Sequence, residues 1–132
     1  MNSGQSKNGL VVKEYMLESG LVKVYNDYVI SIFNEGTTIT LERLLQLLRI
    51  MEIHYENKNF GYISIRKNSY AIDPMIYSYL RELDCLKAFA IVSVKEIDMY
   101  NFNIEKLFYK KPMKFFIDQE NALTWVKRRI RS

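Results

Sequence analysis

The chain has 132 residues and a formal net charge of +4, and hydrophobic residues make up 48% of it. This length fits one domain, and the composition is enough to fill one core and excludes an intrinsically disordered chain. No apolar stretch approaches the roughly 18 residues that cross a bilayer. A single cysteine and a single histidine exclude an internal disulfide and a four-ligand zinc site. We therefore expect one cytoplasmic domain over residues 10–132, after a disordered polar lead-in at residues 1–9.

The first part of the chain predicts short antiparallel strands. Aromatic and β-branched residues in loose alternation indicate three strands, at residues 11–18, 21–25 and 28–33. Turn residues separate these strands, at Ser19-Gly20 and at Asn26-Asp27. Such an order forms a β-meander or a long hairpin, and its exposed edge strand is a place where two copies of the chain could form a homodimer.

A long amphipathic helix is predicted next. Thr40 is a good N-cap, and apolar side chains then recur at helical spacing as far as Tyr55. The stripe that they form is broad, which predicts a helix that lies flat on a sheet. Its members are Leu41, Leu44, Leu45, Leu47, Leu48, Ile50, Met51 and Tyr55.

The rest of the chain alternates apolar strands with helices. Apolar, β-rich runs predict strands at residues 60–65, 86–94 and 113–117. Helices are predicted from the Asp73-Pro74 cap to about Leu83, before Pro112, and after Asp118. The inward residues of the second of these helices are expected to be Ile97, Ile104, Leu107 and Phe108. Those of the third are expected to be Ala122, Leu123, Val126 and Ile130. This order predicts an α/β sheet, parallel in part, with an antiparallel opening.

Several segments carry a family resemblance. Residues 113–126 resemble the C-terminal signature of bacterial SpoIIAA-like proteins, which is a strand, an acidic cap and a helix with an alanine and a tryptophan three residues on. Ala122 and Trp125 match that signature. The segments 61–70, Asp73-Pro74 and 87–92 resemble small uncharacterised bacterial proteins of the same group. The resemblance implies a STAS-like fold: a mixed β-sheet with an antiparallel opening hairpin and about four helices packed on it.

The resemblance also implies a regulatory role, because the best-known STAS proteins are anti-sigma-factor antagonists. In those proteins a phosphorylatable serine begins the helix after the central strand. Ser69 is the nearest hydroxyl here and is a candidate phosphorylation site, although it lacks the acidic residue before it and the glycine after it. Added charge at Ser69 would be favourable beside Arg66 and Lys67.

The loop at residues 66–73 is the candidate binding site, because partners of open α/β sheets meet the loops at the carboxyl ends of the strands. Arg66 and Lys67 carry the positive charge that an anion needs. The alternative is an ordinary turn, in which Tyr70 packs locally. The candidate partner- or ligand-binding residues are Arg66, Lys67, Asn68, Ser69, Tyr70 and Asp73.

Other polar residues favour structural interpretations. His54 lies on the long helix, and the sequence nominates neither a nucleophile nor an orienting partner for it, so we expect a partly buried core histidine. Cys85 is expected to be an inert buried thiol. The basic residues after Trp125 sit at a helix C-terminus, where the helix dipole favours cations, and no nucleic-acid motif accompanies them. We predict no specific nucleic-acid binding.

These observations favour a regulatory or protein-binding module that acts through the loop and helix after the central strand. The alternative is a carrier or sensor of a small apolar or anionic ligand, because related lipid-transfer domains share the architecture and the long apolar helix could line a pocket. An enzyme is the least favoured class, since the sequence contains no catalytic constellation, glycine-rich phosphate loop or metal-binding spacing. No cofactor and no metal are expected.

Overall fold

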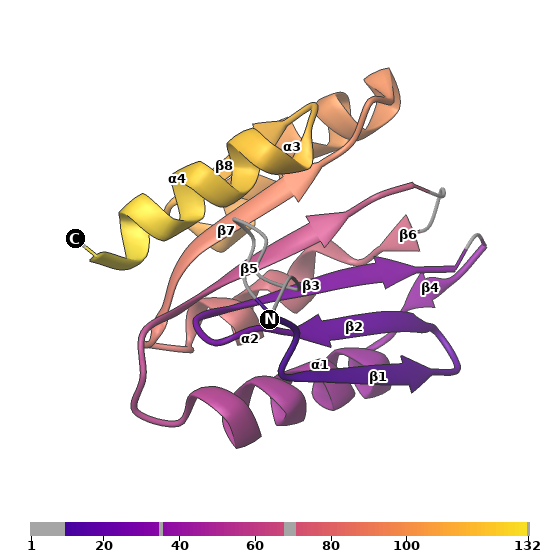
Figure 1. Ribbon diagram of the computed structural model, residues 1–132. Coiled ribbons are helices and arrows are strands. Elements are labelled where there is room, and N and C mark those ends of the chain that lie inside the picture. Colours follow the sequence, from indigo (N-terminus) through magenta and orange to yellow (C-terminus); the bar gives the residue numbers. More distant parts are fainter. Residues whose placement is uncertain (1–9, 35, 68–70, 132) are drawn as a thin grey trace.

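The computed structural model describes residues 10–34, 36–67 and 71–131. Within these ranges the chain forms one six-stranded sheet, one small two-stranded sheet, four α-helices and one 3₁₀ turn (Figure 1). The strands of the large sheet are β1 (Lys13–Leu17), β2 (Gly20–Val24), β3 (Tyr28–Phe33), β5 (Phe60–Ile65), β7 (Leu86–Val92) and β8 (Met113–Phe116). The small sheet pairs β4 (Thr38–Ile39) with β6 (Ala71–Ile72). The helices are α1 (Leu41–Tyr55), α2 (Tyr77–Arg81), α3 (Glu96–Tyr109) and α4 (Gln119–Arg131), and the 3₁₀ turn η1 (Pro74–Ile76) leads into α2.

The large sheet is mixed, as the sequence predicts. Its strand order is β1-β2-β3-β5-β7-β8. The first three strands pair antiparallel, and β3, β5, β7 and β8 pair parallel. Because β1 lies at one edge of this sheet, the expected edge strand is present. The prediction of an α/β sheet with an antiparallel opening is therefore confirmed.

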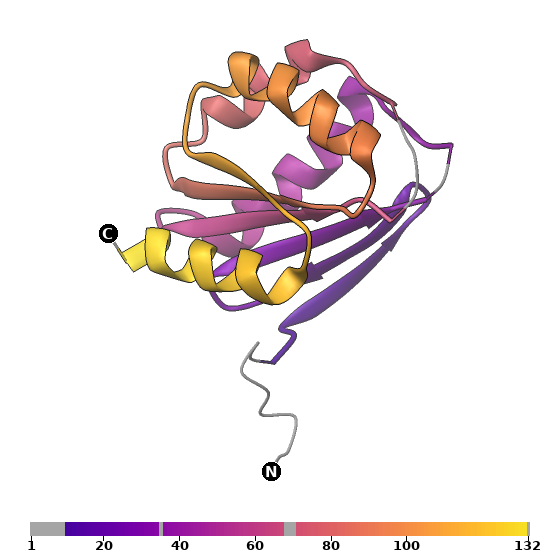
Figure 2. The ribbon, with the colours of Figure 1, turned by 90° about the horizontal axis from the view of Figure 1, so that it is seen from above.

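Helices cover both faces of the sheet. Figure 2 shows α1, α2 and α3 on one face and α4 on the other. The first face holds the larger core cluster, around Met51, Phe89 and Tyr109. The second holds a smaller cluster, in which Ile63 and Ala90 meet Val126. The central strand β5 is buried along its whole length, because a parallel strand covered on both faces exposes neither set of side chains.

The sequence also predicts the buried face of α4. Ala122, Leu123 and Val126 are buried, and Ile130 packs against the same cluster. Beneath this helix, β5 contains Gly61, where a Cβ atom would overlap Cγ1 of Val126. A glycine at this position therefore lets α4 lie close to the sheet.

Helix α1 begins where its capping residue predicts. The Thr40 hydroxyl accepts a hydrogen bond from the Arg43 amide at 3.3 Å, and the apolar face buries Leu44, Leu47 and Ile50. Leu41 and Leu45, which the stripe also included, are exposed.

The Thr40 cap can be tested directly. We expect Thr40→Ala to lower the free energy of unfolding by about 1 kcal/mol, because it leaves the Arg43 amide without its side-chain acceptor. Chemical denaturation measures the change, and Thr40→Ser, which keeps the hydroxyl, is the matched control. A loss of equal size in both variants would contradict a capping role.

The face that α3 buries differs from the prediction. Ile97, Ile104 and Leu107 are exposed, and of the four residues expected inward only Phe108 packs partly against the core. The buried residues of this helix are Asp98, Phe102, Glu105 and Tyr109. The prediction was wrong because polar groups at the strand ends bind the two acidic residues of α3.

Candidate functional site

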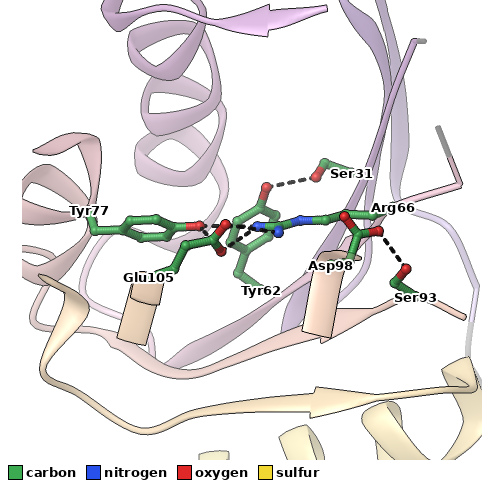
Figure 3. A network of polar contacts seen from close by, with 7 residues as sticks. All are labelled: Ser31, Tyr62, Arg66, Tyr77, Ser93, Asp98 and Glu105. Atoms are coloured by element: carbon green, nitrogen blue, oxygen red, sulfur yellow. Dashed lines mark hydrogen bonds and ion pairs between the residues drawn. The ribbon is translucent and has the colours of Figure 1, made fainter. Parts of the chain in front are cut away.

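A network of buried polar groups lies where two parallel strands end (Figure 3). Arg66 follows the last residue of β5, and Ser93 follows the last residue of β7. The carboxyl ends of neighbouring parallel strands share one edge of a sheet, so these two residues are close, and the Arg66 amide donates to the Val92 carbonyl at 2.9 Å. Both residues are buried, which is unusual for an arginine and requires a charged or polar partner.

Glu105 of α3 is the partner of Arg66. The guanidinium meets the carboxylate in a two-pronged pair, with Nη2 at 2.8 Å from Oε1 and Nη1 at 3.1 Å from Oε2. Tyr77 completes the group: its hydroxyl donates to Oε1 of Glu105 at 2.7 Å and accepts from Nη2 of Arg66 at 3.1 Å. Such a bidentate geometry is the strongest that these two groups form. It joins the end of β5 to α2 and α3.

Asp98 makes the second link from α3 to the strand ends. The Ser93 hydroxyl donates to Oδ2 of Asp98 at 2.6 Å and accepts from the Lys95 amide at 3.0 Å. Asp98 and Glu105 are two helical turns apart and lie on the same side of α3. Together they fix which face of the helix points at the sheet.

A third polar pair lies deeper in the sheet. The hydroxyls of Ser31 on β3 and Tyr62 on β5 are 2.7 Å apart and buried (Figure 3). This pair joins neighbouring strands on the face that α1 and α2 cover.

The network shows no catalytic arrangement in the described residues. Ser93 has a carboxylate beside it but no imidazole, because His54 is bound elsewhere, to Tyr15. A triad needs the base between the nucleophile and the acid. The described part of the chain also contains no group of three or more histidine, cysteine, aspartate or glutamate residues placed to hold a metal ion. The interactions of this network therefore hold α2 and α3 against the strand ends, and among the described residues they form no catalytic arrangement.

The predicted binding residues differ in their exposure to solvent. Arg66 is buried, and the anion that it contacts is Glu105 of the same chain. Lys67 and Asp73 are exposed, and Oδ1 of Asp73 accepts from the Met75 amide at 3.0 Å, which caps η1. Asn68, Ser69 and Tyr70, and with them the proposed phosphorylation, lie outside the described residues, as does the lead-in at 1–9.

Sequence reasoning missed the partners of Arg66. Tyr77 and Glu105 are 11 and 39 residues from it in the chain. One signal was present: Asp98, Phe102, Glu105 and Tyr109 repeat at helical spacing, so they share a face. Two acidic residues among two aromatic residues did not suggest a buried face.

A surface groove borders the predicted site. It has a volume of about 390 Å³ and lies between the start of α1 and the segment η1–α2. Its lining residues are Thr38, Ile39, Thr40, Leu41, Asp73, Met75, Ile76 and Tyr79. Leu41, Met75 and Tyr79 are large apolar or aromatic side chains that remain exposed there. Exposed apolar side chains that gather around a groove are typical of interaction surfaces.

A comparison with solved structures decides the fold. An uncharacterised protein from the DUF3478 family with a SpoIIAA-like fold, from Shewanella loihica PV-4, superposes on this chain with a TM-score of 0.55. The match covers 89% of this chain and 94% of that one, at 15% sequence identity. The fold is SpoIIAA-like. No family model and no curated protein matches the sequence, so the likeness is one of fold.

The larger core cluster of this SpoIIAA-like domain contains a small cavity. A cavity of about 30 Å³ lies between the sheet and helices α1 and α2. That volume holds one water molecule, whereas pockets for small ligands measure roughly 300–1,000 Å³. Apolar and aromatic side chains line most of this cavity, and Ser64 and Arg66 line the rest. The cavity gives no support to the alternative function of a lipid carrier.

No helix in the described ranges has the length and apolar character that a bilayer crossing requires.

His54 lies outside this network. Its Nε2 atom shares a hydrogen bond of 2.7 Å with the Tyr15 hydroxyl, so the histidine ties α1 to β1. Burial, and then the charge of Lys13, lower the pKa of His54 below its ordinary 6.5. The unfolded chain therefore binds a proton at His54 more readily than the folded chain does.

This pKa shift predicts a pH dependence of stability. The free energy of unfolding should fall as the pH drops below 6.5, because the depressed pKa favours the unfolded state in acid. We expect wild type to lose slightly more stability than His54→Gln between about pH 7.5 and about pH 5. Urea titrations at both pH values measure this difference. An equal loss in the two proteins would mean that His54 has no shifted pKa.

Proposed function

We propose that this SpoIIAA-like domain is a non-enzymatic regulatory module that binds a partner protein at the groove between α1 and η1–α2. One observation carries the proposal: Leu41, Met75 and Tyr79 stay exposed around a groove between the start of α1 and η1–α2, the helical segment that follows the central strand. Methionine and tyrosine are enriched at protein interfaces, and tyrosine buries a large area at low entropic cost. The buried network supplies the rigid support behind this surface.

The charges at the groove define the partner further. Asp73 lines the groove, and Glu42, which follows Leu41, is exposed in the first turn of α1. A partner segment with apolar side chains and a neighbouring lysine or arginine would complement both features. We therefore propose an apolar, basic segment of another protein as the occupant.

The test compares two surfaces of the same domain. Leu41→Glu/Tyr79→Glu places charge in the groove, and Ile53→Glu places one on the distant end of α1, where Ile53 is also exposed. A protein recovered from a lysate of the source cells by wild type and by the control, but not by the groove variant, is then purified. We expect it to bind wild type directly and the groove variant at least about tenfold more weakly. Partners that bind the groove variant as well as wild type, or no direct binding at all, would overturn the proposal.

A further inference from the structure

The outward face of α3 carries an apolar seam of two heptads. The seam consists of four exposed side chains, which are Ile97 (57% exposed), Tyr100 (64%), Ile104 (40%) and Leu107 (66%). Their spacing of three, four and three residues is that of the a and d positions of a coiled coil. Figure 2 shows α3 in the helical layer that covers one face of the sheet. In a globular domain such a stripe normally faces the core.

The helix cannot turn this seam inward without a large loss of stability. Rotation of α3 would withdraw Glu105 from Arg66 and Asp98 from Ser93. It would leave the guanidinium of Arg66 buried without its carboxylate, which is a costly arrangement. The network therefore holds the seam toward a partner outside the domain.

The seam is symmetric about its own midpoint. In an antiparallel pair of α3 helices centred at residue 102, Ile97 of one copy meets Leu107 of the other, and Tyr100 meets Ile104. These are the a–d layers of an antiparallel coiled coil, and every apolar residue of the seam has an apolar partner. We propose that α3 pairs antiparallel with α3 of a second copy of this chain, in a two-fold symmetric dimer.

Charge also favours the antiparallel arrangement. Glu96 and Lys110 are both exposed, at opposite ends of α3: Glu96 is the first helical residue, at the g position that flanks the seam, and Lys110 is the C-cap that follows Tyr109, with a φ of 60°. Antiparallel pairing brings Glu96 of one copy beside Lys110 of the other, twice in each dimer. Parallel pairing would instead put both Glu96 residues at one end of the dimer and both Lys110 residues at the other, and Glu96 would then have no lysine of the other copy beside it.

A groove beside α3 extends the interface. Two heptads alone bury less than the roughly 1,200 Å² of a stable interface, so neighbouring surface has to contribute. A groove of about 440 Å³ lies between the end of α3 and α2, and Leu107, Phe108 and Met75 are among its lining residues. The antiparallel register brings the start of the second α3 to this groove, preceded by Val94, which is 85% exposed. Val94 is the side chain that the groove would receive.

Sedimentation equilibrium of the purified chain tests the dimer. We expect wild type and Ile53→Glu to dimerise with the same dissociation constant, and Ile104→Glu to weaken dimerisation at least tenfold. Because residue 104 is exposed in the monomer, this variant should keep the wild-type circular dichroism spectrum. A wild-type chain that stays monomeric up to millimolar concentration, or a dimer that Ile104→Glu leaves intact, overturns the proposal.

A charge exchange tests the register. Glu96→Lys alone and Lys110→Glu alone should each weaken the dimer several-fold, and the double variant should return to the wild-type dissociation constant. Each substitution also opposes the helix dipole, but that effect adds in the double variant and cannot produce recovery. Absence of recovery would overturn the antiparallel register. None of these variants alters Leu41, Met75 or Tyr79, the exposed side chains of the partner groove.

Discussion

Glu105→Ala is expected to lower the free energy of unfolding by about 3–5 kcal/mol, because it leaves the buried guanidinium of Arg66 without its carboxylate. The side chains of Arg66 and Glu105 are only 4% and 9% exposed, so water cannot replace the lost partner cheaply. Tyr77 loses the acceptor of its hydroxyl in the same variant. Few single substitutions in this domain should cost more.

Chemical denaturation of Glu105→Ala and of an apolar double variant measures this effect. Arg66→Met/Glu105→Leu removes both charges and fills the space with apolar atoms, and we expect it to recover most of the loss. The recovery separates the cost of an unpaired charge from the cost of lost packing. A loss below about 1 kcal/mol in Glu105→Ala would indicate a solvent-exposed pair and contradict the burial on which the network depends.

Gly61→Ala is expected to cost about 1–3 kcal/mol, because the added methyl group overlaps Val126 beneath α4. Val126 is fully buried and β-branched, so its side chain has little freedom to move aside. The helix has to shift away from β5 or the strand has to distort. The other atoms near the new Cβ, in Ile130 and Ala88, are at 3.4 and 3.5 Å, which is ordinary contact.

The matched control for Gly61→Ala is the same substitution in a Val126→Ala background. Removing the two valine methyl groups makes room for the new one, so the double variant should be less destabilised than the sum of the two single variants. Denaturation midpoints of the four proteins give the coupling energy. Strict additivity would show that α4 does not rest on Gly61.

Elements with a strong apolar pattern could be predicted from the sequence. The apolar runs predicted at 60–65 and 86–94 contain β5 and β7, because a strand covered on both faces has no polar side to obscure the pattern, although β7 ends at Val92. The inward face of α4 was equally clear, since its outer face is charged. The mixed α/β sheet follows from these elements and their order, whereas the SpoIIAA-like fold was implied by the resemblance that residues 113–126 carry.

The orientation of α3 could not be predicted in the same way. Its apolar residues at 97, 104 and 107 satisfy the usual rule that apolar faces point inward, yet they point outward. The deciding interactions join Arg66 to Glu105 and Ser93 to Asp98, and periodicity within one helix contains no information about such partners. Arg66 was assigned to an exposed loop for the same reason: a cation after a strand indicates solvent unless its distant carboxylate is known.

The position of the candidate site was partly accessible to sequence reasoning. The order of the elements predicted that the segment after β5 would lie at the carboxyl ends of the parallel strands. The Asp73-Pro74 pair predicted the start of the next helical segment, and Asp73 is the N-cap of η1. The groove beside it depends on the exposed side chains of Leu41 and Tyr79, which come from two helices distant in sequence. Their meeting is a property of the packed chain.

The orientation of α3 underlies both the buried network and the proposed dimer, and nuclear Overhauser contacts measure it most directly. We expect contacts from the Phe102 ring to Phe115 and from the Tyr109 ring to Phe89, because these pairs of ring centroids are 5.7 and 5.3 Å apart. We expect no contact from the Ile104 or Leu107 methyl groups to Phe89. Methyl contacts from Ile104 and Leu107 to Phe89, with Phe102 in solvent, would contradict this orientation of α3.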